Sequence, residues 1–213
     1  MRPVGPVYRV ARKPNPWAPI DWAYAADDKT FGNRYDDPEG EYRVLYASSE
    51  PLGCFVETLA RFRVDPKLAA ELMEISGDDD HYPLGEIPPE WLEQRCLGTA
   101  SCVGDYADVC SAGWIGKLRT ALARDLATYG FTDLDASALQ HANRPFTNRV
   151  SRLIYESGSN GIYYRSKHGH DLENWALFEP FAHLVPTAIE AIRHDDPAFE
   201  GALRLHALKL GPR

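Results

Sequence analysis

The sequence predicts an α+β fold in which short, mostly antiparallel strands are flanked by helices. Three observations lead to this class. Helical and strand-like patterns do not alternate regularly along the chain, which disfavours a doubly wound parallel sheet. Most of the strand-like runs are short. Neither glycine-rich nucleotide motif, GxGxxG or GxxxxGK(S/T), occurs in the chain, so the folds that carry those motifs are disfavoured as well.

Length and composition are those of one globular domain. The chain has 213 residues, of which 44% are hydrophobic and 25% are charged, as in ordinary globular domains. Its formal net charge of -8 disfavours direct nucleic-acid binding, because phosphate backbones repel an acidic surface. Aromatic residues make up 11% of the chain, a slight excess that suits either a core or a pocket for a flat ligand.

Sequence features of export, membrane insertion and metal binding are missing. No stretch approaches about 18 consecutive apolar residues, so no membrane span is expected. The segment MRPVGPVYRV lacks the apolar core of a secretory signal. The four cysteines, at positions 54, 96, 102 and 110, form no CxxC pair, so we expect reduced thiols and no structural zinc site. The resulting expectation is a cytoplasmic protein.

The first third of the chain predicts a long loop, a strand and a helix. Residues 11–40 are rich in proline and glycine, as in a loop, and long loops are often functional. Residues 41–48 alternate as in a strand, and Pro51 opens a helix. Glu57 lies outside the centre of the apolar stripe of this helix, so it either flanks a cleft or faces water. The stripe consists of Leu52, Phe55, Val56, Leu59 and Phe62.

The middle of the chain mixes strands and helices. Residues 69–75 favour a strand, although a helix is also compatible with them. A short helix around residues 88–91 precedes a strand at residues 95–104. A longer helix is predicted between an N-cap at Ser111 and a stop at Gly130.

The last third predicts a helix and two strands. The helix begins near Thr147, and strands follow at residues 161–165 and 174–179. The polar loop between them contains the run His168-Gly169-His170-Asp171, which we interpret as solvated rather than as a metal site. After Pro186 we expect a weakly amphipathic helix.

Side chains suited to a charged, flat ligand gather in residues 31–63. Arg34 and Tyr35 lie in a glycine-marked loop, Tyr46 in the predicted strand and Glu57 in the predicted helix. The planar fork of arginine suits phosphate or carboxylate, and tyrosine rings stack on flat ligands. The same residues are also compatible with a purely structural role, as a surface arginine, two core tyrosines and a solvated glutamate.

The order of these motifs resembles the RES domain family, which is named for an arginine, a glutamate and a serine. The family pattern runs from a Tyr-Arg strand through a Gly-Gly-Arg-Trp/Tyr loop and a Val-Tyr-Leu-Ala strand to a helix with glutamate. A Gly-Ile-x-Tyr-x-Ser strand and an Asn-x-x-Leu-Phe strand follow. The matching segments here are residues 8–9, 32–35, 45–47, 56–58, 161–166 and 174–178. The resemblance covers residues 7–180 of a single domain, 1–213, with 181–213 as a C-terminal extension.

The resemblance implies an ADP-ribosyltransferase-like fold with a split sheet and a cleft that binds NAD as a substrate without a metal. It implies the toxin of a toxin–antitoxin pair, with an Xre-type helix-turn-helix antitoxin as partner. Relatives consume NAD by hydrolysis or phosphorolysis, or transfer ADP-ribose to a protein, and the sequence leaves these alternatives open. An inactive module with an NAD pocket is a further alternative. A homodimer is one of the oligomeric states that the sequence leaves open.

Site residues follow from the resemblance position by position. The family's serine is expected at the start of the helix before the strand at residue 161, where this chain has Thr147. We therefore expect Thr147 to supply the hydroxyl of the site, with Ser166 as the second candidate. The expected catalytic residues are Glu57, Arg9 and Thr147, and the expected NAD-binding residues are Arg34, Tyr35, Tyr46 and Ser166.

These residue types suit the chemistry that the family implies. Cleavage of a glycosidic bond passes through an oxocarbenium-like state that is positive at the ribose. A carboxylate such as Glu57 stabilises that charge or orients the incoming water. Arginines bind the two phosphates, tyrosines pack on the nicotinamide or adenine ring, and a hydroxyl holds the nicotinamide amide or a ribose.

Overall fold

The computed structural model describes residues 1–76, 83–181 and 183–212. In this part of the chain, seven strands form one sheet in the order β5-β6-β7-β2-β1-β4-β8, and only the β5–β6 pair is parallel. The predicted α+β class, with mostly antiparallel strands, is therefore confirmed. The strands are β1 (Val7–Arg12), β2 (Val44–Ser48), β4 (Arg95–Cys102), β5 (Tyr106–Asp108), β6 (Gly161–Ser166), β7 (Gly169–Phe178) and β8 (Leu184–Ala191).

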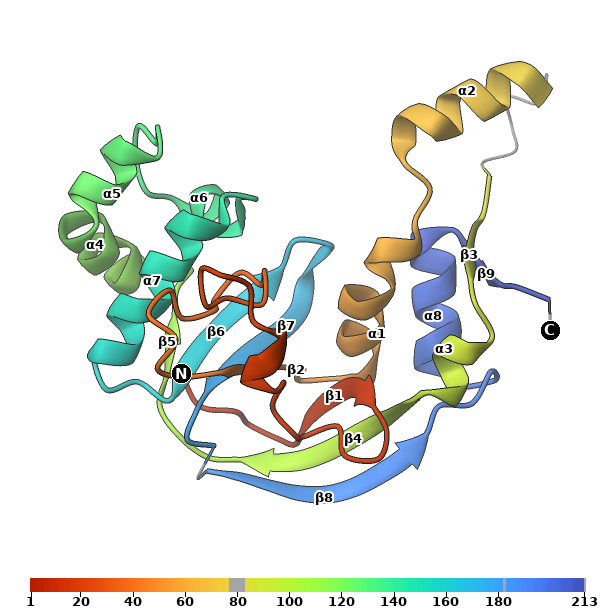
Figure 1. Cartoon of the computed structure of the whole chain (residues 1–213), viewed down its shortest axis with the longest axis horizontal. Coiled ribbons are helices and arrows are strands. Elements are labelled where there is room, and N and C mark those ends of the chain that lie inside the picture. Colours follow the sequence, from red (N-terminus) through yellow and green to blue (C-terminus); the bar gives the residue numbers. More distant parts are fainter. Residues whose placement is uncertain (77–82, 182, 213) are drawn as a thin grey trace.

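Two groups of helices flank this sheet (Figure 1). On one side lie α4 (Ala112–Ala121), α5 (Ala123–Thr128), α6 (Ala136–Gln140) and α7 (Arg144–Glu156). On the other side lie α1 (Pro51–Leu59), η2 (Ala60–Phe62), α2 (Pro66–Ser76), α3 (Glu90–Glu93) and α8 (Pro197–His206). A small parallel pair, β3 (Gly85–Ile87) with β9 (Leu208–Leu210), belongs to the second side.

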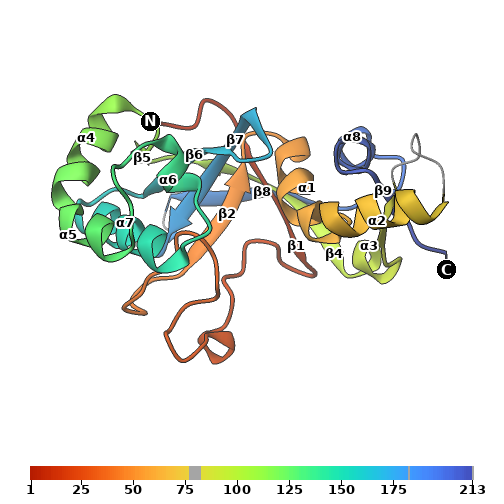
Figure 2. The ribbon, with the colours of Figure 1, turned by 90° about the horizontal axis from the view of Figure 1, so that it is seen from above.

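The sheet is split in the middle. Strands β1 and β2 pair at one position, Tyr8 with Ser48, whereas β1 pairs with β4 along its whole length. Likewise, β2 pairs with β7 from Val44 to Ser48. The two halves of the sheet therefore meet at the Tyr8–Ser48 pair and diverge from there toward Val44 of β2 and Arg12 of β1. The segment between β1 and β2, which includes η1 (Trp22–Tyr24), projects from the body at this point (Figure 2).

Each half of the sheet has its own hydrophobic core. The apolar face of α7 packs against β6 through Phe146, Val150 and Ile154, which are fully buried. On the other side α1 and α8 pack together, and the rings of Phe55 and Phe199 meet edge to face at 5.5 Å. Since α8 contributes its buried face to this core, the C-terminal segment is an integral part of the fold.

Two predicted strand and helix assignments are wrong. Residues 69–75 lie in the helix α2, because Asp65 accepts hydrogen bonds from the backbone N–H groups of Lys67 and Leu68 and the Ala, Glu, Leu and Met residues that follow favour helix. The expected helix after Pro186 is instead the edge strand β8, which pairs with β4, and the helix α8 comes later. Because β8 is exposed along most of its length, its sequence shows no burial alternation.

Three other boundaries differ from the sequence analysis. The predicted helix from Ser111 to Gly130 is interrupted at Leu122, which gives α4 and α5. Helix α7 begins at Arg144, because the Asn143 side chain caps it. The strand β7 starts at Gly169, so most of the expected polar loop is part of a β-hairpin.

No helix in the described part of the chain is long and apolar enough to cross a membrane. All four cysteines are free thiols.

We predict that Phe199→Ala lowers the free energy of unfolding by about 3–5 kcal/mol, because a fully buried ring is removed from the α1–α8 core. Urea denaturation measures this change. Leu205→Ala on the same helix is the control, since Leu205 is 63% exposed, and it should change stability by less than about 0.5 kcal/mol. Similar effects of the two variants would contradict the packing of α8 described above.

Candidate active site

A cavity of about 420 Å³ lies where the two halves of the sheet diverge. Its walls come from β1, β2, α1, the loop at residues 31–34, the first residue of α7 and the turn between β6 and β7. Its size falls in the range of small-molecule sites. The residues that line it include Arg9, Ile20, Phe31, Asn33, Arg34, Arg43, Val44, Tyr46, Gly53, Glu57, Arg61, Arg144, Lys167, His168 and Asn174.

Glu57 is the one carboxylate among the described residues that line this cavity. Its Oε1 accepts hydrogen bonds from Ser166 Oγ at 2.7 Å and from Asn174 Nδ2 at 3.0 Å. Within the described part of the chain no donor bonds to Oε2. The carboxylate is therefore held by one oxygen, and the other is free to face a ligand.

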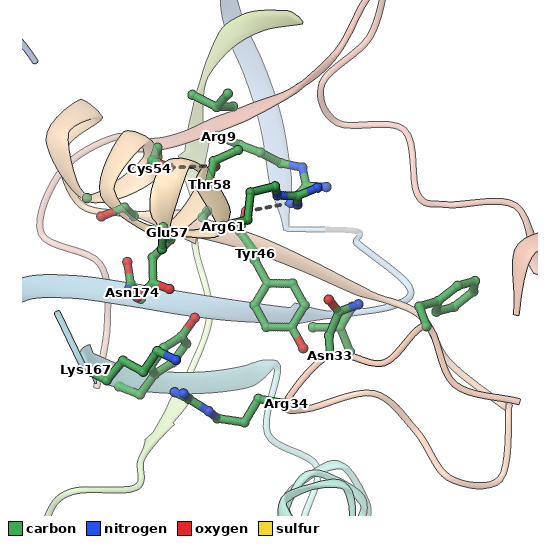
Figure 3. Close-up of a pocket in the computed structure, with 18 of the residues that line it drawn as sticks. Arg9, Asn33, Arg34, Tyr46, Cys54, Glu57, Thr58, Arg61, Lys167 and Asn174 are labelled. Atoms are coloured by element: carbon green, nitrogen blue, oxygen red, sulfur yellow. Dashed lines mark hydrogen bonds between the residues drawn. The ribbon is translucent and has the colours of Figure 1, made fainter. Parts of the chain in front are cut away.

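Gly53 allows α1 to approach the sheet closely enough for this arrangement. A Cβ at Gly53 would clash with Ser48 Oγ, so a larger residue would push the helix away from β2. One turn later on the same helix, Glu57 faces the cavity, as Figure 3 shows. Of the two orientations that the sequence left open, the structure shows the one that flanks a cleft.

Apart from Glu57, the charged side chains that line the cavity are positive. Five cationic side chains of the cavity make no ion pair with any described residue: Arg9, Arg34, Arg61, Arg144 and Lys167. Arg34 Nε and Arg144 Nη1 are buried and have no hydrogen-bond partner among the described residues. Buried donors of this kind are costly unless a ligand satisfies them. The chemistry of this donor set fits an anion with several oxygens, such as a pyrophosphate.

Arg9 bridges the gap between the two halves of the sheet. Its Nε donates to the carbonyl of Pro16 at 2.8 Å and its Nη1 to the carbonyl of Tyr46 at 2.7 Å. Burial lowers the pKa of the guanidinium to about 10, so it stays charged at neutral pH. Arg9 thus lines the cavity, as predicted, and also links β1 to β2 through a hydrogen bond.

The loop that carries Arg34 is fixed by two buried side chains that the sequence analysis did not single out. Asp36 Oδ2 accepts hydrogen bonds from the backbone N–H groups of Phe31 and Asn33, at 2.8 and 2.7 Å. With its amide oriented to satisfy its surroundings, Asn148 donates to the carbonyls of Asn33 and Arg34, at 3.1 and 2.9 Å. Because Asn148 belongs to α7, the loop is tied to that helix.

The two tyrosines predicted for ligand binding lie in different places. Tyr46 lines the cavity, and its hydroxyl accepts a hydrogen bond from the backbone N–H of Tyr35. The Tyr35 side chain is 1% exposed and packs edge to face on Tyr164 in the core. The structure therefore brings Tyr46 to the cavity and keeps Tyr35 behind it.

The hydroxyl beside Glu57 comes from Ser166, and the structure does not bring Thr147 to the cavity. Because α7 starts at Arg144, Thr147 lies inside its first turns, fully buried, and its hydroxyl donates to the backbone carbonyl of Arg144. Ser166 ends β6, donates to Glu57 and accepts from the backbone N–H of His168. The correction follows from the position of the helix start, which the Asn143 cap determines.

Lys167 and His168 are cavity residues that the sequence analysis missed. They form the turn between β6 and β7, and both line the cavity near Glu57. Burial, followed by the charge of Arg34, lowers the pKa of Lys167. The signal in the sequence was the polar run itself, which also fits a solvated loop. In the described part of the chain, no cluster of three or more His, Cys, Asp or Glu side chains could hold a metal ion.

Comparison with protein families matches residues 6–197 to the RES domain. A search of curated proteins finds no match to this chain. Among solved structures, the chain is similar to one in the crystal structure of the M. tuberculosis MbcT–MbcA toxin–antitoxin complex. The two chains are 13% identical with a TM-score of 0.53, and the similarity covers 95% of this chain and 88% of the other. At that identity the likeness shows the fold alone.

We predict that acid destabilises the protein partly through His168. Burial is the main cause that lowers its pKa from 6.5 to about 4, and the charge of Glu57 opposes this shift. Between these values the unfolded chain binds a proton that the folded chain does not. The stabilising contribution is therefore complete above pH 6.5 and is lost as the pH falls toward 4.

Urea denaturation at pH 7.0 and pH 4.5 measures how much unfolding free energy is lost on acidification. This loss should be about 1–2 kcal/mol smaller in His168→Asn than in wild type. Arg63, Lys167 and His206 also disfavour the charged imidazole, so they stay unchanged in both proteins. His170→Asn, an exposed position on the same hairpin, is the control. An identical loss of stability in wild type and His168→Asn would contradict the burial of a neutral imidazole.

Proposed function

The chain belongs to the RES domain family, and from this premise we propose that it is an enzyme that cleaves the nicotinamide–ribose bond of NAD. One observation carries the proposal. A single carboxylate, Glu57, is held by Ser166 and Asn174 with one oxygen free, in a cavity whose lining also holds five cations without an ion pair to any described residue. That combination suits a substrate with anionic phosphates and a reacting centre that becomes positive.

The pyrophosphate of NAD is proposed to bind between Arg34 and Arg144. Each of these side chains has a buried donor without a partner, and Lys167 adds a further positive charge nearby. Charge-assisted hydrogen bonds from arginine to phosphate are among the strong ones in proteins. The phosphates would reduce the repulsion among these cations and would accept hydrogen bonds from the buried donors of Arg34 and Arg144.

Glu57 acts at the ribose in this proposal. As nicotinamide leaves, positive charge develops at the ribose carbon, and the free oxygen Oε2 of Glu57 stabilises it or orients a ribose hydroxyl. Ser166 and Asn174 keep the carboxylate in place through Oε1, so they are positioning residues. Arg9 keeps the wall of the cavity formed by β1 and β2 together.

The acceptor of the ADP-ribosyl group is water or inorganic phosphate in the leading proposal. Attack by water gives ADP-ribose and a proton, and attack by phosphate gives the 1″-phosphate of ADP-ribose. Transfer to a protein side chain is the alternative that uses the same site. Separation of the products on an ion-exchange column, with and without phosphate, distinguishes the first two. Labelled NAD in a bacterial lysate detects the third as a labelled protein band.

The biological role that we propose is that of the toxin in a toxin–antitoxin pair. The RES domain match and the similarity to a chain of the MbcT–MbcA toxin–antitoxin complex support it. The partner that the family resemblance suggests is an Xre-type helix-turn-helix antitoxin. Growth arrest together with loss of cellular NAD on induction, reversed by co-expression of the adjacent gene product, would establish this role.

We predict that Glu57→Gln lowers the rate of NAD cleavage by about 10²–10⁴-fold, since it removes the negative charge at the ribose. Glutamine retains an oxygen that can accept from Ser166 and Asn174, so the fold should persist. Release of nicotinamide by purified protein measures the rate. Ser166→Ala should lower kcat by about ten-fold through loss of the positioning bond, whereas Thr147→Val should retain full activity.

The matched control is Glu50→Gln, which changes an exposed carboxylate just before the same helix. Equal NAD cleavage by wild type and Glu57→Gln would exclude this active site. Binding of NAD without cleavage by the wild type would instead favour the inactive binding module.

We also predict that Arg34→Gln and Arg144→Gln each raise the KM for NAD by about 10–100-fold with little change in kcat, because each removes a charged hydrogen bond to phosphate. Arg34→Lys should recover only part of this loss, since lysine lacks the planar fork. Initial rates at varied NAD provide the measurement. Arg119→Gln, which breaks an exposed pair with Asp133, is the control. A change confined to kcat would contradict the phosphate assignment.

A further inference from the structure

We propose that three apolar side chains at the outer end of the cavity, Ile20, Phe31 and Val44, bind the adenine ring of NAD. We call this group the apolar ledge. The inference rests on the proposed function, because it assigns a second part of the same substrate. It predicts that the protein acts on a dinucleotide in preference to nicotinamide mononucleotide.

The register of the sheet shows that the ledge and Glu57 lie at opposite ends of the cavity. Ser48, at the end of β2, pairs with Asn174, which donates to Glu57. Val44, at the start of β2, pairs with Phe178. Four residues of strand span about 13 Å. A ligand with its scissile bond at Glu57 therefore needs an extended second half to reach the ledge.

Tyr46 lies between these ends, midway along β2 from Val44 to Ser48. In Figure 3 the Tyr46 ring lies between Glu57 and Asn33, and Arg34 passes below it. The order along the cavity is then the carboxylate of Glu57, Tyr46 with Arg34, and the apolar ledge. This is the order of ribosyl nicotinamide, pyrophosphate and adenosine in NAD.

The ledge has the surface that a purine requires. Phe31 and Val44 are half-buried and line the cavity, and Ile20 lines it while 51% exposed. The Phe31 ring also packs against Trp22, with ring centroids 5.4 Å apart. An aromatic ring supported on one side and open to a cavity suits stacking with a base, which is tolerant of sequence because every base has a flat face.

Hydrogen bonds hold the ledge in position without a ligand. The backbone N–H of Phe31 donates to Asp36 at 2.8 Å. Arg43 Nη1 donates to the carbonyl of Ile20 at 3.2 Å, and the same guanidinium forms an ion pair with Glu179, with Nε 2.8 Å from Oε2. Its charge is therefore neutralised within the protein, unlike that of the cations nearer Glu57. The ledge is thus the neutral, apolar end of an otherwise positive cavity.

The test compares binding of two probes that share a ribose phosphate. ADP-ribose adds a second phosphate and adenosine and has no nicotinamide, whereas nicotinamide mononucleotide keeps nicotinamide. ADP-ribose carries adenosine, and nicotinamide mononucleotide lacks it. Titration calorimetry on the full chain should show that Phe31→Ala weakens ADP-ribose binding by about ten-fold and leaves mononucleotide binding within two-fold. Phe31→Trp, which keeps a flat ring, should bind ADP-ribose within about two-fold of wild type.

Tyr24→Ala is the matched control, since Tyr24 lies in the same segment, is 77% exposed and does not line the cavity. Unchanged mononucleotide binding shows that Phe31→Ala is folded. Equal weakening of both probes, or weakening of neither, would overturn the ledge assignment and leave the role of Glu57 intact. Failure of the wild type to bind either probe would contradict the ledge and the proposed function together.

Discussion

The structure depends on a sheet that opens between two neighbouring strands. Strands β1 and β2 meet at Tyr8 and Ser48 and then separate, which leaves backbone groups of both strands without a ladder partner. Arg9 compensates in part, because its guanidinium donates to the carbonyl of Tyr46 across the gap. Cys54 adds a contact from α1 to the carbonyl of Tyr8. The cavity exists because this opening is maintained by side chains rather than closed by strand pairing.

Charge is distributed unevenly in relation to this opening. The chain is acidic overall, but five cations without an ion pair to any described residue line the cavity, and two of them bury a donor with no hydrogen-bond partner in the described part of the chain. Such an arrangement reduces the stability of the free protein and is retained where a ligand supplies the missing charge. The net charge of the chain therefore does not predict the charge of the cavity lining. The prediction against direct nucleic-acid binding concerned the surface, and nothing in the structure tests it.

The parts of the fold that followed from the sequence are those determined locally. The stripe around Phe55 and Leu59 led to α1, and alternation led to β2, because burial on one face imposes those periods. Strand β8 could not be predicted, since its state is determined by pairing with β4, more than 80 residues away. For α2 the helix was an open alternative, and the cap at Asp65 decides it. At the site, Glu57, Arg34 and Tyr46 were placed by motif, while Lys167 and His168 needed the hairpin geometry.

The position of the hydroxyl illustrates why motif order alone is insufficient. Helix α7 starts at Arg144, three residues before the predicted start, and Thr147 is fully buried in it with its hydroxyl bonded to the carbonyl of Arg144. Ser166, the last residue of β6, donates instead to Glu57 Oε1, and Asn174 of β7 donates to the same oxygen. Asn174 pairs with Tyr164, two residues before Ser166. The position of Ser166 depends on the pairing of β6 with β7, whereas the start of α7 depends on its cap at Asn143. The residues that hold the Glu57 carboxylate therefore come from the strands, and the helix α7 contributes Arg144, its first residue, to the cavity lining.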